Sequence, residues 1–373
     1  MARGEIRPVE TGDLAAITRI VRDCGFPERS QAGWHWVLFD NPDQDGIASG
    51  WVCEREGTVV GFIGNFAMRY RLGERIVRTA VGHTMVTDLG GAGRQAGLAL
   101  ARHGTRQPDV DVYSTLNNNG LSARILPRIG VVPWLGEAGR VWLEWPTAPL
   151  RIAVTRVQKA LQRAGAECER FDRAFDLGLG ITAQLSSRLT LTPLDQVDDA
   201  VLARLCERLA AHDGGPQAAV RVFDRERLDY RRADPDRAGG LDYMVACRDG
   251  EPVLLAASVL TKPSADGLEH VEIVDWLGVN DADGIAAQGE VLRHLLDRAR
   301  QAGVAKVRLH FPQALPDAVI RAGGWCLTRR LDYDPCHAQF RDSAMRQAWT
   351  PLPGDADFFF AYRTPPGLMR QAG

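Results

Sequence analysis

The sequence predicts a mixed α/β protein built from two copies of one unit in tandem. Three observations predict this class. The chain has 373 residues, which is enough for two domains of ordinary size. Short sequence landmarks recur in the same order at nearly one spacing. Within each copy, strand and helix signals alternate as they do in a mixed sheet covered by helices.

Five pairs of segments carry the repeat: IRPVETGDLAAI with LTPLDQVDDAVL, WHWVLFDNPD with LDYRRADPD, WVCEREGTVVGF with MVACRDGEPVLL, VGHTMV with EIVDWL, and RILPRIGVVPW with AVIRAGGWCL. They pair Pro8 with Pro193, Trp36 with Tyr230, Gly57 with Gly250, His83 with Asp275 and Gly130 with Gly324, at spacings of 185, 194, 193, 192 and 194 residues. We therefore expect one domain over 1–149, a linker over 150–188, and a second, degenerate domain over 189–373.

Each element of the first copy has its own local signal. A strand over Glu5–Val9 leads to a helix whose start is marked by Thr11 and Asp13, residue types that favour the N-cap. The later elements are a hairpin of Gly50–Glu54 and Val59–Met68 around Glu56-Gly57, a strand over Arg75–Thr87, a helix over Ala96–His103, a strand over Val110–Leu116 and a helix over Ser122–Ile129 that ends at Gly130.

The linker predicts a basic amphipathic helix. Its apolar residues at helical spacing are Leu150, Val154, Val157 and Leu161, and its cations are Arg151, Arg156, Lys159 and Arg163. Such a helix can lie on a membrane surface or dock a partner. More often it packs on its own domain with the charges in water, and that is the arrangement we expect here.

Composition limits the other classes of function. A net charge of -2 gives no field that would draw the whole molecule to DNA. The chain has no run of eighteen apolar residues, and its first residues lack the apolar region of a signal peptide, so we expect a cytoplasmic protein. The seven cysteines and eight histidines are scattered without ligand spacing, so we expect neither a disulfide framework nor a metal site.

The order of elements, with Val81–Ala101 leading into Val112–Gly130, resembles the core of the GNAT N-acetyltransferases. More narrowly, the tandem domains resemble a bacterial double-GNAT group often associated with polysaccharide biosynthesis, through Asp40-Asn41-Pro42, Thr84-Met85-Val86 and Gly354-Asp355-Ala356-Asp357. The resemblance implies that the fourth strand splays from the fifth and that acyl-CoA lies in the gap. Backbone N–H groups and the dipole of the next helix would then hold the pyrophosphate.

This implied donor is acetyl-CoA or another acyl-CoA, with no metal. Its implied contacts are Met85, Val86, Thr87, Gly91, Gly93, Arg94, Gln95, Ala96, Gly97, Asn117, Asn118 and Asn119. The family's turn reads Arg or Gln, two free positions, Gly, one free position, then Gly or Ala. Ala92, Gln95 and Gly97 stand at those places, so only the final glycine fits. The three asparagines either contact the donor through their amides or form a polar turn that caps the next helix.

Acyl transfer to an amine needs a polarised carbonyl and groups that move protons. The backbone N–H of Met85 or Val86 would polarise the carbonyl. His83 is the candidate base, because imidazole titrates near neutral pH, although a hydrogen-bonded structural histidine explains it equally well. A bulge in its strand would fix which face it meets. The family's acidic tyrosine is absent, so Tyr113 is the candidate acid, or else a packing residue.

The second copy has acidic residues where a pyrophosphate would sit. Asp281 and Asp283 would repel it, so we expect no CoA there. Asp275, which matches His83, is a further catalytic candidate. The residues expected to bind the acceptor are Trp34, Trp36, Glu272 and Asp275. Ordinary buried ion pairs would explain the two carboxylates nearly as well.

Three functions fit this sequence. The first is an acyl-CoA-dependent N-acyltransferase in which a small amine or amino-sugar attacks the thioester directly. The second is a tandem GNAT protein that binds or scaffolds without catalysis, which the altered turn favours. The third takes an aminoacyl group from tRNA, which requires a basic track for the RNA backbone. Only the helix over Arg151–Arg163 offers such a track, so we expect the first function and no tRNA partner.

Overall fold

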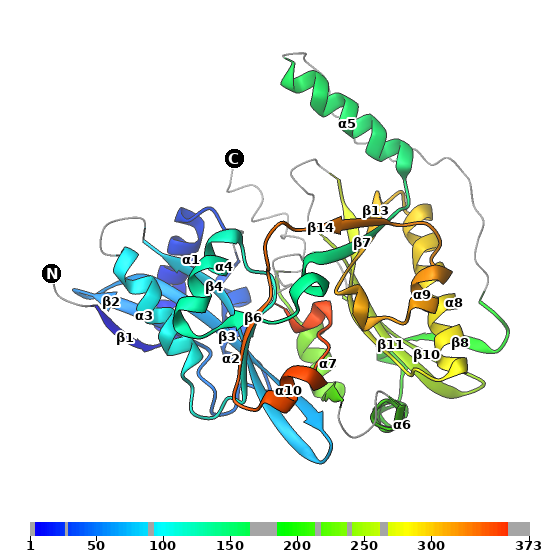
Figure 1. The fold of residues 1–373 in the computed structure, drawn as a ribbon, viewed down its shortest axis with the longest axis horizontal. Helices are drawn as coiled ribbons and strands as arrows, with labels where there is room; N and C mark the ends of the chain where they lie inside the picture. Colours follow the sequence, from blue (N-terminus) through cyan, green and yellow to red (C-terminus); the bar gives the residue numbers. More distant parts are fainter. Residues whose placement is uncertain are drawn as a thin grey trace.

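Two mixed β-sheets with helices packed on them form the protein (Figure 1). The computed structural model describes residues 4–26, 29–88, 93–164, 185–212, 218–236, 241–261 and 268–356. The first sheet holds β1 (Glu5–Pro8), β2 (Gly50–Arg55), β3 (Thr58–Leu72), β4 (Arg75–Thr87), β5 (Val112–Thr115), β6 (Val132–Pro133), β9 (Ala219–Arg221) and β15 (His337–Phe340). The second holds β7 (Val141–Pro146), β8 (Leu189–Pro193), β10 (Asp242–Arg248), β11 (Glu251–Leu260), β12 (His270–Gly278), β13 (Lys306–His310) and β14 (Leu327–Arg330). The predicted mixed α/β class is confirmed.

Helices cover both faces of the first sheet. The helices before β2 are α1 (Leu14–Asp23) and α2 (Gln31–Phe39), and those after β4 are α3 (Gly93–Thr105) and α4 (Gly120–Ile125). The apolar stripe of α1, which includes Ile17 and Val21, packs with Phe62 on one face. Leu100 of α3 packs with Ile63 on the other face, because neighbouring strand residues point to opposite sides.

The second sheet carries a matching series of helices. They are α6 (Asp199–His212), α7 (Arg225–Arg232), α8 (Ala282–Gln301) and α9 (Asp317–Ala322), whereas α10 (Ser343–Ala348) packs against the first sheet through Met345. Special positions recur with the same spacing. Ser30 caps α2 and Asp224 caps α7, each accepting a backbone N–H three residues on. Gly130 and Gly324 both have positive φ, 89° and 77°.

Each sheet contains strands from the other half of the chain: β9, which pairs with β3, and β15 lie in the first sheet, and β7 lies in the second. In the first sheet, β15 lies between β5 and β6 and is antiparallel to both. In the second, β7 lies between β13 and β14 in the same way. The exchange is reciprocal, so no single cut in the sequence separates the two sheets. The domain boundaries at 149 and 189 stay a prediction about the sequence repeat.

Buried ion pairs join the halves where α1 leads into α2. Arg29 is 3% exposed, and its guanidinium lies 2.5 Å from Asp234 and 3.5 Å from Asp236. Both carboxylates follow α7 in the second half. A buried pair of this kind is costly to break, because the remaining charge would be left without a partner. These contacts therefore fix α2 against α7.

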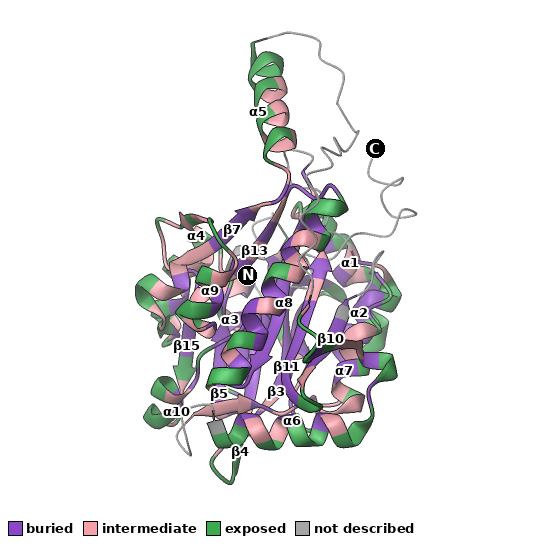
Figure 2. Ribbon diagram, turned by 90° about the vertical axis from the view of Figure 1, so that its right-hand side faces the viewer, coloured by how far each residue is buried: buried purple, intermediate pink, exposed green. Residues whose placement is uncertain are grey.

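Helix α5 (Pro149–Arg163) projects away from both sheets (Figures 1 and 2). None of its residues is buried, and Arg151 donates a hydrogen bond to the carbonyl oxygen of Gly303 at its base. The expectation that this helix packs along its own domain is wrong. Its apolar residues find no described surface to cover. No helix in the described part of the chain combines the length and apolar character needed to cross a membrane.

Candidate functional site

Strands β4 and β5 separate partway along their length. They pair in parallel at Thr79–Val112, Ala80–Tyr113 and Val81–Ser114, where the recorded pairing ends. Strand β4 continues to Thr87 along β3. Beyond Val81, the edge of β4 that faces β5 therefore lies beside a gap. Backbone groups on such an edge are open to hydrogen bonding with an extended ligand.

A β-bulge lies in β4 at this gap. Phe62 of β3 is opposite Val86, and Gly64 is opposite His83, so three steps on β4 match two on β3. Thr84 within the bulge has φ of 47°, which is unusual for a β-branched residue. Strained backbone of this kind concentrates at functional sites. The sequence predicted that a bulge would decide which face of the sheet His83 meets, and the structure contains a bulge at this place.

His83 lies on the α2 side of the sheet. Its ring covers Gly64, where an added Cβ would come within 2.0 Å of it. It stacks on Trp34 with ring centroids 6.5 Å apart, and its Nδ1 lies 3.1 Å from Oγ1 of Thr84. Burial lowers the pKa of His83 to about 3, and the positive charge of Arg29 adds to the effect. The imidazole is therefore neutral at physiological pH and is a weak base.

Tyr113 lies on the opposite side of the sheet, facing α3. Its hydroxyl rests against Gly82, where an added Cβ would lie 1.9 Å from the oxygen, and an added Cβ on Gly104 of α3 would lie 3.6 Å from it. Tyr113 is 3% exposed. Two glycines therefore make the space that the phenol occupies beside the gap.

A cavity of about 90 Å³ lies in the gap. It brings together the predicted residues His83, Tyr113, Met85 and the three asparagines. The described residues that line it are Phe26, Ile63, Gly82, His83, Thr84, Met85, Ala101, Tyr113, Thr115, Asn117, Asn118, Asn119, Ser122 and Leu126. Phe26, Thr84, Thr115 and Ser122 were not predicted as site residues. Nothing in their local sequence marks them, because the bulge and the parting of the strands place them there.

The three asparagines differ in what they contact. Asn118 donates to Oγ1 of Thr115 at 2.6 Å and to the carbonyl oxygen of Pro335 at 2.9 Å. Asn119 caps α4 by accepting the N–H groups of Leu121 and Ser122. Asn117 is exposed at the mouth of the cavity. The polar-turn interpretation thus describes Asn118 and Asn119, and a ligand contact by Asn117 stays a prediction.

Helix α3 is the next element after β4 in the described part of the chain. Helix α3 begins at Gly93, and Gly97 packs beside Thr87, where an added Cβ would lie 3.5 Å from its methyl group. Ala96 is 5% exposed and faces the core instead. Val86 and Thr87 end β4, and Val86 is buried. Gly91 lies outside the described residues, as do the side chains of Arg94 and Gln95.

The matching place in the second sheet is filled by the protein itself. Strand β12 parts from β13 after Glu272–Arg308, but the side chain of Gln288 fills the space beside Gly278 and donates to the carbonyl oxygen of Val279 at 2.9 Å. Asp281 caps α8 by accepting the N–H of Gly284 at 2.7 Å. A carboxylate of the chain thus already occupies the position that an anion would take.

Asp275 and Glu272 are enclosed in ion pairs. Asp275 is 2.7 Å from Arg221 and 3.3 Å from Arg231, and it accepts the hydroxyl of Tyr243. Burial raises the pKa of Asp275, but the two guanidinium groups outweigh it and hold the pKa below its usual value. Glu272 lies 2.7 Å from Arg308 and 3.3 Å from His310. Despite its burial, these neighbours lower the pKa of Glu272 to about 2.

The four residues predicted to bind the acceptor are not brought together. Trp34 is fully buried under His83, and Trp36 packs against Tyr230 of α7. Asp275 and Glu272 lie on β12 of the second sheet. None of the four lines the gap cavity. Their acceptor role stays a prediction, and the contacts described here account for their burial.

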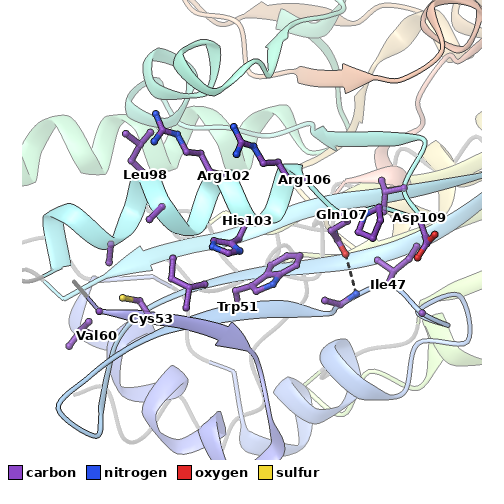
Figure 3. Close-up of a pocket in the computed structure, with 18 of the residues that line it drawn as sticks. Ile47, Trp51, Cys53, Val60, Leu98, Arg102, His103, Arg106, Gln107 and Asp109 are labelled. Atoms are coloured by element: carbon purple, nitrogen blue, oxygen red, sulfur yellow. Dashed lines mark hydrogen bonds between the residues drawn. The ribbon is translucent and has the colours of Figure 1, made fainter. Parts of the chain in front are cut away.

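The largest cavity recorded in the described part of the chain lies elsewhere, with a volume of about 1040 Å³ (Figure 3). It runs between α3 and the β1–β2 edge of the first sheet, so α3 separates it from the gap. Trp51 and Cys53 form its floor, and its wall is lined by Arg102 and His103 of α3 and by Arg106, which follows the helix. Among the described residues, no group of three or more His, Cys, Asp or Glu side chains could hold a metal ion.

No protein-family model matches the chain, and no curated protein sequence matches it. Solved structures do match its fold. GCN5-related N-acetyltransferases from Kribbella flavida and Anabaena variabilis give TM-scores of 0.53 and 0.52 at 12% and 13% identity. Both alignments cover 91% of this chain, and they cover 71% and 73% of those chains. Saccharomyces cerevisiae N-myristoyltransferase with bound myristoyl-CoA gives 0.50 at 10% identity, covering 91% of this chain and 83% of that one.

These identities are low, so the likeness concerns the fold. The parted strands and the helix that follows β4 are the features that the sequence resemblance implied. The predicted GNAT acyl-CoA N-acyltransferase fold is confirmed.

Proposed function

We propose that this chain, which has the GNAT fold, is an acyl-CoA-dependent N-acyltransferase whose donor binds between β4 and β5. The observation that carries the proposal is the end of pairing at Val81–Ser114, which leaves one edge of β4 beside a lined cavity. The residues fit an acyl-CoA. An extended pantetheine chain can hydrogen-bond along a strand edge, and the N-terminus of α3 follows that strand. The bound donor would supply an activated thioester carbonyl.

The residues of the gap suggest how the chain would assist. The bulge at Thr84 re-aims the backbone of β4, so the N–H of Met85 or Val86 is the proposed hydrogen-bond donor to a carbonyl oxygen. Tyr113 carries the most acidic hydroxyl in the cavity lining, because a phenol is far more acidic than the hydroxyls of serine and threonine. We assign it the proton for the departing thiolate.

His83 has a smaller part in this proposal than the sequence suggested. With its pKa lowered to about 3, the imidazole is uncharged at neutral pH, with one ring N–H, and it accepts a second proton poorly. We propose that it orients Thr84 through the 3.1 Å contact and that the acceptor amine arrives already neutral. Among the described residues that line the cavity there is no cysteine. Direct attack by the amine is therefore the proposed route.

The acceptor class is a small amine or an amino-sugar, and the amino-sugar rests on the resemblance to the polysaccharide-associated group. The second sheet would not bind CoA, because Gln288 and Asp281 occupy the equivalent places. The second sheet would have a structural part, because it holds β7 of the first half between β13 and β14. A cytoplasmic location remains our proposal from composition.

The test is transfer from labelled acetyl-CoA to a panel of amines and amino-sugars. Tyr113→Phe should lower kcat by about tenfold to a hundredfold while leaving acetyl-CoA binding in place. Tyr333→Phe, which changes another tyrosine outside the cavity lining, is the control and should leave kcat unchanged. Transfer to none of the panel, together with no binding of acyl-CoA, would contradict the proposal and favour a scaffold protein.

A further inference from the structure

Helix α5 presents its apolar stripe to solvent. Leu150, Val157 and Leu161 are 42%, 59% and 44% exposed. Ala153 and Ala160, at helical spacing from them, are exposed too, so all five lie on one side. In Figure 2 the helix shows exposed and intermediate residues along its length and no buried ones. An amphipathic helix normally turns this side towards a core.

The same helix carries only positive charge. Its charged residues are Arg151, Arg156, Lys159 and Arg163, and no Asp or Glu occurs between 149 and 164. Arg156 and Arg163 are exposed. They lie three or four residues from Ala160, so they border the apolar stripe. The exposed surface thus combines an apolar band with adjacent cations.

A second apolar group lies at the end of the molecule from which α5 leaves. Strand β14 pairs with β7 from Leu327–Glu144, and β7 ends two residues later at Pro146, close to the start of α5. Because the strands are antiparallel, Trp325 lies at this same end of β7. It is 72% exposed, the largest exposed fraction recorded for a large hydrophobic residue in the described part of the chain.

We propose that α5 and Trp325 dock the protein on the surface of a bilayer rich in anionic lipid. The apolar stripe would enter the boundary between headgroups and acyl chains, and the cations would lie at the lipid phosphates. Tryptophan is enriched at this boundary because its ring is apolar and its N–H is polar. An anionic bilayer is the partner that we propose because it would contact both the apolar stripe and the cations of α5.

Other partners use only part of this surface. RNA would meet the four cations but leave Val157 and Leu161 in water. A second copy of α5 could cover the stripe, but it would bring four cations against four. Neither RNA nor a second copy of α5 would explain why Trp325 is exposed at the same end of the molecule. The membrane proposal does not depend on the proposed acyl transfer.

The test is co-sedimentation of the full-length protein with vesicles. We expect binding to vesicles of phosphatidylcholine and phosphatidylglycerol in equal parts, and little binding to phosphatidylcholine alone. Val157→Asp should weaken binding by about tenfold or more, because it removes buried apolar area and adds repulsion. Paired Arg156→Gln and Arg163→Gln should weaken it by a similar factor, more strongly at low salt.

Leu121→Asp is the matched control, because Leu121 is 68% exposed on α4 and should leave vesicle binding unchanged. Melting curves would show that each variant folds. The proposal is overturned if wild type ignores anionic vesicles or if Val157→Asp binds them as wild type does. It is also overturned if Val157→Asp only converts a dimer to a monomer, or if RNA, and not vesicles, binds in a salt-dependent way.

Discussion

The indole of Trp36 stacks on the ring of Tyr230, with ring centroids 4.8 Å apart and an interplanar angle of 21°. The indole also donates its N–H to the carbonyl oxygen of Tyr230 at 2.9 Å. The two residues lie 194 apart, on α2 and α7, and they are the pair that the sequence repeat matches. Equivalent positions of the two halves therefore meet each other, which places α2 and α7 at the centre of their junction.

Loss of this contact should weaken the junction. Trp36→Phe keeps a ring but removes the indole N–H from the carbonyl of Tyr230, which still accepts the N–H of Ala233, so the loss should cost about 0.5–1.5 kcal/mol. Trp36→Ala should cost about 3–5 kcal/mol, because it also removes the packed ring. Urea unfolding measures both. His35→Ala on the same helix, an exposed residue, is the control and should change stability by less than about 1 kcal/mol. A Trp36→Ala value as small as the control's would contradict this account.

The exchange of β7 and β15 predicts that neither half folds alone. Residues 1–149 would lack β15, so β5 and β6 would lose the strand between them, and β7 would have no sheet to join. We expect each half, expressed separately, to be insoluble or unfolded by circular dichroism. Coexpressed halves, cut between 164 and 185, should copurify. A soluble, cooperatively folded 1–149 fragment would disprove the exchanged arrangement.

A substitution at Asp275 distinguishes a structural role of this carboxylate from a role in binding the acceptor. Asp275→Asn removes the charge that Arg221 and Arg231 share, and among the described residues Arg221 then keeps its ion pair with Asp355, at 2.9 Å. We expect a loss of about 3–5 kcal/mol in the free energy of unfolding, as for a buried pair deprived of one partner. Asp229→Asn, which changes an exposed aspartate on α7, should cost little. Unchanged stability with a raised KM for the acceptor would restore the predicted substrate role.

His83 predicts a particular dependence of stability on pH. The folded state keeps its imidazole neutral down to about pH 3, whereas in the unfolded chain it takes up a proton near pH 6.5. Between these values the unfolded state binds more protons, so stability falls as the pH falls. His83 alone should contribute a slope of about 1.4 kcal/mol per pH unit in that window.

Comparison with His83→Gln isolates this contribution, because other groups titrate alike in both proteins. Unfolding free energies measured between about pH 7 and pH 5 should fall less steeply for the variant. His35→Gln, at an exposed position, should follow wild type. Equal slopes for wild type and His83→Gln would mean that the imidazole is protonated in the folded protein.

Much of the fold could be predicted because its signals are local. The strand over Arg75–Thr87 matches β4 at both ends, and the Glu56-Gly57 turn has positive φ at both residues, as a two-residue hairpin requires. The exchange of β7 and β15 could not be predicted. The strand pattern of Val141–Pro146 is the same whichever sheet it joins, so only the tertiary structure selects the partner.

Part of the candidate site could be predicted, because some of its residues also have local signals. His83, Tyr113 and Asn117 lie in consecutive elements of the repeat, and the gap brings them to one cavity. The positive φ of Thr84 has no local signal, because β-branched residues disfavour that conformation. Asp275 pairs with Arg221, which also pairs with Asp355, and all three residues are distant in sequence. Gly354 is also explained only by the structure, since an added Cβ would lie 2.1 Å from Asp275.

The most direct test of the donor site is the melting temperature with and without acetyl-CoA, measured on wild type, Gly97→Trp and Gly12→Trp. Gly97 packs beside the end of β4, whereas Gly12 has open space around it and serves as the control. At a hundredfold excess over Kd, a ligand that binds only the folded state should stabilise it by about 2.7 kcal/mol. The account predicts a rise for wild type and Gly12→Trp that is lost in Gly97→Trp. No rise in wild type, or an equal rise in all three proteins, would contradict a donor site between β4 and β5.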